Sequence, residues 1–106
     1  SPLIRKRVVA ARQRQIKRFK RKKTWNNSQM NLQEIKLFCQ LDKAGRGLME
    51  RAMESLNLSA RAYVKILKVA RTIADLEGDE SSILNPAFLA EAIQYRLFDR
   101  DTLSSR

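Results

Sequence analysis

Apolar residues recur every three or four positions along most of the chain, and no segment alternates apolar and polar residues over a sustained stretch. The first spacing is typical of a helix that packs on a core, whereas strict alternation is typical of a half-buried strand. The pattern therefore predicts an all-α fold of five helices. The apolar positions expected on the helix faces are Ile4, Val8, Val9, Ala11, Ile16 and Phe19; Ile35, Phe38 and Cys39; Ala44, Leu48, Met49, Ala52, Met53 and Leu56; Tyr63, Ile66, Leu67, Ala70, Ile73 and Ala74; and Phe88, Leu89, Ala92, Ile93 and Leu97.

Residues that cap helices stand where these segments begin and end. Asn31 followed by Glu34 has the spacing of a capping box, in which each side chain bonds the backbone N–H of the other residue. Gly78 favours a helix end, because glycine adopts the left-handed conformation without strain. Ile83 and Leu84 are expected to form a short extended segment before the last helix. The predicted helix starts are Ser1-Pro2, Asn31, Asp42, Ser59 and Asn85-Pro86.

Positive charge is concentrated at the N-terminal end. The chain has 22 Lys and Arg against 11 Asp and Glu, and half of the bases lie in residues 1–24, where there is no acid. Residues 25–106 are therefore neutral overall. We divide the chain into a basic N-terminal helix, residues 1–24, which frays within Lys20 to Lys23, and a helical domain, residues 25–106, that begins with a polar loop. The two are expected to form one structural unit.

Such a basic run attracts phosphate through a screened field that does not depend on sequence. Any nucleic-acid contact is expected to be non-specific, because only Phe19 and Trp25 stand near enough to stack on bases. The alternative is a solvated helix whose charge is balanced by the acidic surface of a larger protein. The candidate phosphate-binding residues are Arg5, Arg7, Arg12, Arg14, Lys17, Arg18, Lys20, Arg21, Lys22 and Lys23.

Residues that the chain lacks exclude several kinds of chemistry. There is no histidine and one cysteine, Cys39, so we expect no metal site and interpret Cys39 as a small buried hydrophobe. The three glycines are too scattered to form a phosphate-binding loop. Asp75 and Glu77 are two residues apart on a predicted helix, so they point in different directions and form no catalytic pair. We expect this chain to bind no cofactor and to catalyse nothing alone.

No stretch approaches the roughly 20 apolar residues of a membrane-spanning helix, and the N-terminal end lacks the apolar run of a signal peptide. We therefore expect a cytoplasmic protein that has no membrane contact.

The predicted fourth helix carries a row of basic residues opposite its core face. Arg61, Lys65 and Lys68 follow one another at spacings of four and three. Lys65 and Lys68 fit an ordinary solvated face as well as a secondary basic ridge. Arg61 is different because it lies two residues after the cap Ser59, where the positive end of the helix dipole disfavours a cation. An arginine there, together with the helix N-terminus, suits an anion supplied from outside the domain, such as a nucleotide phosphate.

A larger pattern covers nearly the whole chain. It consists of Leu58-Ser59-Ala60-Arg61-Ala62-Tyr63 with its continuation from Lys65 to Leu76, of Val8, Ala10-Ala11-Arg12, Arg14-Gln15 and Arg18 upstream, and of Leu89 to Arg96 with Asp99-Arg100 downstream. This pattern resembles the C-terminal domain of magnesium-chelatase-like ATPases, the competence protein ComM group. The chain departs from the family pattern between Lys20 and Trp25, where it is longer and more basic.

The resemblance implies a helical lid that follows a AAA+ core, with Arg61 as the sensor-2 arginine that reaches the γ-phosphate of ATP. It also implies that the natural chain continues upstream of Ser1 into a domain with a phosphate-binding loop. The full-length protein would then bind ATP and Mg²⁺ and act as an ATPase. Its implied partners are that core, neighbouring subunits of a hexameric ring, and DNA, since competence members are associated with branch migration during natural transformation.

Two alternatives do not require an ATPase. A stand-alone basic helical module would bind nucleic acid non-specifically through residues 5–23, with an affinity that falls steeply as salt is added. An oligomerisation element would use exposed parts of the apolar face of the first helix to associate with further copies.

Overall fold

The computed structural model describes the backbone of residues 2–18 and 27–104, and the side chains of residues 3–18 and 27–96. The prediction of an all-α fold is confirmed, with five α-helices, one short 3₁₀ helix and two very short strands in this part of the chain. Ser1, Phe19 and the expected fraying at Lys20 to Lys23 lie outside the described residues, as does the side chain of Leu97. The elements are α1 (Pro2–Arg18), η1 (Asn27–Gln29), α2 (Leu32–Phe38), β1 (Gln40–Leu41), α3 (Lys43–Leu56), α4 (Ala60–Glu77), β2 (Ile83–Leu84) and α5 (Pro86–Ser104).

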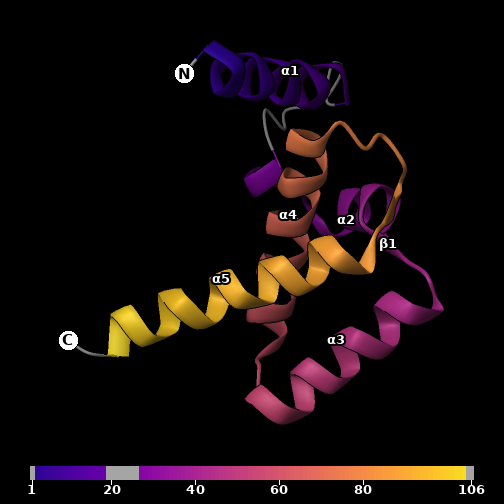
Figure 1. Cartoon of the computed structure of the whole chain (residues 1–106). Helices are drawn as coiled ribbons and strands as arrows, with labels where there is room; N and C mark the ends of the chain where they lie inside the picture. The colour runs from indigo at the N-terminus through magenta and orange to yellow at the C-terminus, as the bar shows by residue number, and fades with distance from the viewer. Residues whose placement is uncertain (1, 19–26, 105–106) are drawn as a thin grey trace.

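Helix α4 runs through the middle of the molecule, and α1, η1, α2, β2 and α5 all contact it (Figure 1). α1 lies across the C-terminal end of α4, α5 crosses α4 nearer its middle, and α3 packs against α5. Ile66 and Ala70 of α4 meet Leu89 of α5 in a core where all three side chains are almost fully buried. The expected core faces of α4 and α5 are therefore largely confirmed.

The predicted caps form as expected. Asn31 Oδ1 accepts from the Glu34 backbone N–H at 2.9 Å, and Glu34 Oε1 accepts from the Asn31 N–H at 3.1 Å. Asp42 Oδ1 accepts from the Gly45 N–H at 2.7 Å, and Ser59 Oγ from the Ala62 N–H at 3.1 Å. These side chains satisfy backbone donors that have no partner within the helix, which is why α2, α3 and α4 begin where they do.

A pair of two-residue strands was only half predicted. Ile83 and Leu84 are extended, as expected, and pair in parallel with Gln40 and Leu41 of β1, which the sequence pattern did not reveal. Two residues are too few to produce a visible alternation, so β1 leaves no periodic signal. The pairing joins the segment after α2 to the segment before α5.

The apolar face of α3 differs by one residue from the prediction. Ala44 is exposed, while Gly45 beside it is buried. A Cβ atom on Gly45 would lie 3.1 Å from Cδ1 of Leu89, so the missing side chain allows α5 to approach the start of α3 closely. Hydrophobic spacing alone could not identify a glycine as a contact position.

Helix α1 is oriented with three of its five arginines toward α4. Of its expected apolar positions within residues 3–18, only Ala11 is buried, whereas Ile4, Val8, Val9 and Ile16 are exposed. Three arginines on the inner side contact the C-terminal end of α4 and the loop after it. Arg7 bonds Glu77 and the Leu76 carbonyl, Arg14 bonds the Asp75 carbonyl and Glu80, and Arg18 bonds the Asp75 carboxylate. Polar contacts, more than apolar ones, hold α1 in place.

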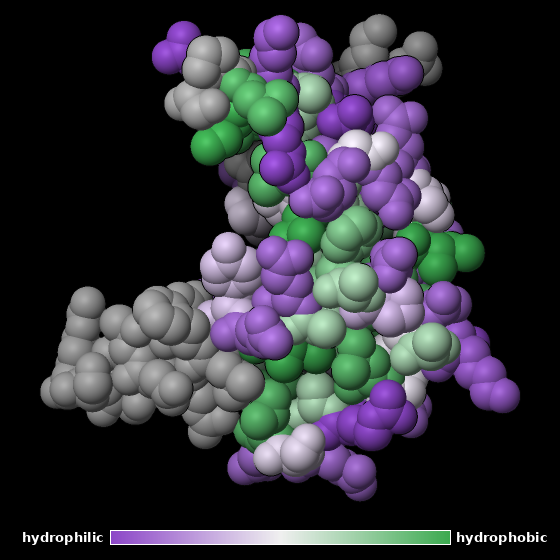
Figure 2. Space-filling view, in the orientation of Figure 1, coloured by the Kyte–Doolittle hydropathy of each residue, from purple (hydrophilic) through white to green (hydrophobic). Residues whose placement is uncertain are grey.

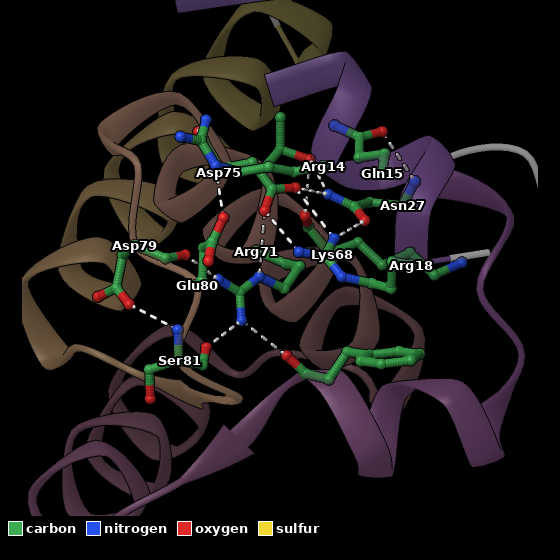
Figure 3. A network of polar contacts seen from close by, with 12 residues as sticks. Arg14, Gln15, Arg18, Asn27, Lys68, Arg71, Asp75, Asp79, Glu80 and Ser81 are labelled. Carbon is green, nitrogen blue, oxygen red and sulfur yellow. Dashed lines mark hydrogen bonds and ion pairs between the residues drawn. The ribbon is translucent and has the colours of Figure 1, made fainter. Parts of the chain in front are cut away.

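The carboxylate of Asp75, which is fully buried, is the centre of this attachment (Figure 3). Arg18 Nη2 donates to Oδ1 at 2.7 Å and Arg18 Nη1 to Oδ2 at 3.1 Å, a paired geometry that is strong for a carboxylate. Asn27 Nδ2 donates to Oδ2 at 2.8 Å, and Arg71 Nε lies 3.7 Å from Oδ1. Residues of α1, η1 and α4 therefore meet at one buried charge.

Arg71 connects the cluster to α2 and to the loop after α4. It is 1% exposed and donates to the backbone carbonyls of Phe38, Asp79 and Ser81 at 2.6–3.0 Å. Burial lowers the pKa of Arg71, an effect that the negative charge of Asp75 opposes. The guanidinium thus fixes the end of α2 and the acidic loop after α4 to the same helix.

We expect Asp75→Asn to lower the free energy of unfolding by about 3–5 kcal/mol, because it leaves two arginines without their shared counter-charge in a buried site. Urea-induced unfolding followed by circular dichroism measures this loss. The matched control is Glu77→Gln, which removes the acid of the exposed pair with Arg7 and is expected to cost less than about 1 kcal/mol. Equal losses of unfolding free energy in the two variants would show that the buried cluster stabilises the fold no more than an exposed ion pair does.

Candidate functional site

Arg61 is the second residue of α4 and extends from the surface at the N-terminal end of that helix. Its side chain is exposed, and no described residue hydrogen-bonds or ion-pairs with it. The first turn of α4 contains no acidic residue either. The local preference for negative charge at a helix N-terminus is therefore unmet within the described part of this chain.

A groove of about 850 Å³ extends from Arg61 along one side of α4. Figure 2 shows the surface hollowed on the left of the molecule, below α1. The wall is mostly apolar and contains three cationic side chains but no Asp or Glu. Its lining residues are Ser28, Ala60, Arg61, Val64, Lys65, Lys68, Val69, Thr72, Ile73, Leu76 and Tyr95.

The predicted basic ridge lies along this groove, and its far end is attached to η1. Lys65 is exposed, but Lys68 Nζ donates to the Ser28 carbonyl at 2.9 Å. Thr72 Oγ1 accepts from Asn27 Nδ2 at 3.1 Å. Lys68 therefore helps to fix the groove wall, while Arg61 and Lys65 are the cations that face solvent near its start.

The structure divides the candidate phosphate-binding residues of α1 into two groups. Arg7, Arg14 and Arg18 point toward α4 and are engaged there. Arg5, Arg12 and Lys17 are exposed and form no ion pair with a described residue. The remaining candidates, Lys20, Arg21, Lys22 and Lys23, lie outside the described residues. Fewer cations of α1 are thus open to an external phosphate than the sequence alone indicates.

Sequence reasoning missed the apolar wall of the groove. Val64, Val69 and Leu76 lie off the predicted core face of α4, yet they are half-buried beside the groove. The signal available in the sequence was that α4 has more apolar residues than its predicted core face requires. Sequence reasoning also treated Asp75 only as a possible catalytic acid, and the structure shows it as a buried structural charge.

The lining of the groove contains no carboxylate and no cysteine. Within the described residues, no three Cys, Asp or Glu side chains gather as a metal site would require. The same part of the chain contains no helix that is long and apolar enough to cross a membrane. What the site offers is a positive end and an apolar wall, which suit an anionic group on a docked surface.

Cys39 follows α2 and is buried in the core, as predicted. Burial raises the pKa of its thiol from 9.0 to about 11, although the nearby positive charge of Arg71 acts in the opposite direction. The reactive form of cysteine is the thiolate. Both burial and protonation therefore disfavour thiol chemistry at neutral pH.

We expect Cys39 to resist iodoacetamide at pH 8 in the folded protein, because its thiol is protonated well below a pKa of about 11. The same protein unfolded in urea serves as the control and is expected to be alkylated rapidly at pH 8, since the exposed thiol regains an ordinary pKa. Mass spectrometry of timed samples measures both rates. Rapid modification of the folded chain would show that Cys39 is accessible and reactive.

The chain matches the family described as magnesium chelatase, subunit ChlI C-terminal, over residues 1–96. It is 42% identical over 100 residues to the uncharacterized protein YifB of Escherichia coli K12, and 41% identical over 100 residues to the competence protein ComM of Haemophilus influenzae. YifB of Salmonella typhimurium is 38% identical over the same length. No solved structure matches the chain.

These alignments cover 94% of this chain but only 18–19% of each relative. The chain therefore spans about a fifth of the length of the relatives it resembles. The similarity includes the whole of α4 and of the groove, from Ser28 to Tyr95, within the matched residues 1–96.

Proposed function

The chain belongs to the family of magnesium chelatase subunit ChlI C-terminal domains, and we propose that it is the helical lid of a AAA+ ATPase whose nucleotide is bound by another domain. The observation that carries this proposal is Arg61, an exposed arginine at the start of α4 that has no counter-charge among the described residues. In this role Arg61 donates to the γ-phosphate of ATP held by a core domain of the same or a neighbouring subunit. It stabilises the negative charge that spreads over the phosphoryl oxygens during transfer.

The groove beside Arg61 supports the same proposal. Val64, Val69 and Tyr95 provide an apolar wall on which a core domain docks, while Arg61 and Lys65 stand at the end where phosphate oxygens would lie. Burial of an apolar contact around a cation excludes water and strengthens its interaction with phosphate. The groove lining has no carboxylate, so Mg²⁺ would have to find the oxygen ligands that it prefers on the core domain.

A lid of this kind couples nucleotide state to the position of the domain. Because α4 is a continuous helix from Ala60 to Glu77, a pull on Arg61 at one end is transmitted to α1 at the other through the Asp75 cluster. In a ring of subunits, hexameric in the family that the chain resembles, movement of this rigid unit alters contacts with the neighbour. Phosphate contact at Arg61 would thereby be linked to ring assembly.

In the full-length protein we expect Arg61→Ala to lower the kcat for ATP hydrolysis by about 100-fold or more, because it removes a cation aimed at charge that develops in the transition state. Steady-state phosphate release measures the effect. Circular dichroism is expected to be unchanged, since Arg61 is exposed and forms no hydrogen bond or ion pair with a described residue. The control is Arg46→Ala, which removes an exposed arginine near the start of α3, outside the groove. Unchanged turnover in Arg61→Ala would remove the proposed role.

We also propose that the full-length protein acts on DNA. The support is its similarity to a relative named as a competence protein, together with the basic N-terminal residues. The structure gives less support to the stand-alone nucleic-acid module, because three arginines of α1 are engaged with α4.

If DNA is the substrate, duplex DNA is expected to raise the ATP turnover of the full-length protein several-fold at 50 mM salt, and this stimulation is expected to weaken at 200 mM salt as phosphate contacts are screened. A coupled ATPase assay measures turnover with and without DNA. A heparin sample of matched charge concentration controls for a general polyanion effect. Turnover that does not respond to DNA at either salt concentration would contradict this part of the proposal.

A further inference from the structure

Arg96 of α5 contains a buried nitrogen atom that has no hydrogen-bond partner. The side chain is half-buried, and its Nε donates to no acceptor in the described part of the chain. Arg71 Nε also lacks a hydrogen bond, but it lies 3.7 Å from the Asp75 carboxylate, whereas Arg96 forms no ion pair with a described residue. A buried donor without a partner loses its hydrogen bonds to water, so such atoms are rare in native proteins. Arg96 Nε therefore indicates an acceptor from outside the described residues.

A small cavity lies beside Arg96, between α4 and α5. Its volume is about 40 Å³, which is enough for an ordered water molecule or for one oxygen atom of a larger anion. The lining residues are Lys65, Ile66 and Val69 of α4 and Ala92, Tyr95 and Arg96 of α5. Lys65, Val69 and Tyr95 also line the groove along α4, so the cavity adjoins the groove. An anion in the groove can therefore place one oxygen beside Arg96.

Lys65 is a second cation at this place that lacks a counter-charge. It is exposed, and no described residue hydrogen-bonds or ion-pairs with it. It follows Arg61 by one turn of α4, which is a rise of about 6 Å. Neither the cavity nor the groove is lined by Asp or Glu. Arg61, Lys65 and Arg96 thus bring positive charge from two helices to one region whose lining supplies no acid.

The chemistry of these groups distinguishes the acceptors that could complete the site. A water molecule would accept from Arg96 Nε but would leave the positive charges unbalanced. A carboxylate of the core domain would balance a single charge. A chain of phosphates provides several negative charges on adjacent groups, and both guanidinium and ammonium groups bind phosphate oxygens. With Arg61 at the γ-phosphate, as proposed above, the next phosphate of the same nucleotide is the group available to Lys65 and Arg96.

We propose that Lys65 and Arg96 bind the β-phosphate of the nucleotide, with one phosphate oxygen at Arg96 Nε in the cavity and another at Lys65 Nζ at the edge of the groove. This inference rests on the proposed function, since a core domain must bring the nucleotide to α4. The β-phosphate is common to ATP and ADP and is not the group transferred. Lys65 and Arg96 therefore act mainly on the affinity for both nucleotides, whereas Arg61 acts on the charge that develops during transfer.

The test measures nucleotide affinity in the full-length protein. Fluorescence titration with mant-ADP, and with a mant-labelled non-hydrolysable ATP analogue, gives two dissociation constants in the presence of Mg²⁺. We expect Lys65→Gln and Arg96→Gln each to weaken binding of both nucleotides at least about tenfold, the loss that follows when a hydrogen bond to a charged group is removed. The kcat at saturating ATP is expected to fall less than about fivefold in these variants, unlike in Arg61→Ala.

Matched controls are Lys43→Gln and Arg46→Gln, which change exposed residues of α3 outside the groove and the cavity. Both are expected to bind the two nucleotides as the unaltered protein does.

Thermal unfolding separates nucleotide binding from a merely structural role. Because Arg96 Nε bonds no described residue, Arg96→Gln is expected to leave the melting temperature without nucleotide unchanged. ADP and Mg²⁺ stabilise a protein in proportion to how tightly they bind it, so they are expected to raise the melting temperature less in Lys65→Gln and Arg96→Gln than in the unaltered protein. Differential scanning fluorimetry measures these temperatures.

The possible outcomes distinguish this inference from the proposed function. A loss of turnover in Arg61→Ala, with mant-ADP affinity unchanged in both Lys65→Gln and Arg96→Gln, would overturn the inference alone. A lower melting temperature of Arg96→Gln without nucleotide, at unchanged affinity, would assign Arg96 to a carboxylate of the core domain instead. Calorimetric binding of inorganic phosphate that depends on Arg96, when binding of mant-ADP does not, would assign the site to free phosphate. Unchanged turnover in Arg61→Ala, together with unchanged affinity in every variant, would overturn both.

Discussion

The buried carboxylate of Asp75 is the interaction on which the rest of the arrangement depends. It accepts hydrogen bonds from Arg18 of α1 and Asn27 of η1, and it lies beside Arg71 of its own helix. A charge with no exposure to water is stable only where partners surround it, so these segments must come together for the fold to form. Once they do, α1 is held with Arg7, Arg14 and Arg18 inward. Val8, Val9 and Ile16 of the same helix are then left exposed.

The same cluster shapes the groove along α4. Asn27, which bonds Asp75, also donates to Thr72, and the neighbouring Ser28 carbonyl accepts from Lys68. One end of the groove wall is therefore attached to the cluster, while Arg61 stands at the other end, about 21 Å along the helix by its rise per residue. Helix α4 therefore has a buried charge, Asp75, near its C-terminal end and an exposed charge, Arg61, near its N-terminal end.

Local signals predicted the helices well, because caps and core spacing act within a few residues. Asn31, Asp42 and Ser59 form their expected bonds, and Cys39 is buried as expected. The same signals could not predict which face of α1 packs on α4. An arginine that bonds a distant carboxylate cannot be distinguished in the sequence from an arginine that faces solvent. Arg18 and Asp75 are 57 residues apart. The β1–β2 pair and the groove wall were missed for the same reason, as each depends on contacts between distant segments. Arg61 could be proposed because its position at the start of a helix is itself a local signal, whereas the role proposed for it rests on the family resemblance.

The central claim, that this domain brings Arg61 to a nucleotide held elsewhere, is tested most directly by a structure of the full-length protein with a non-hydrolysable ATP analogue and Mg²⁺ bound. The account predicts the Arg61 guanidinium within hydrogen-bond distance, about 2.7–3.2 Å, of a γ-phosphate oxygen in at least one subunit. It also predicts that the Arg18–Asp75 pair is intact in the same subunit. An Arg61 side chain that faces solvent in every ATP-bound subunit, with the groove of α4 away from the nucleotide, would contradict it.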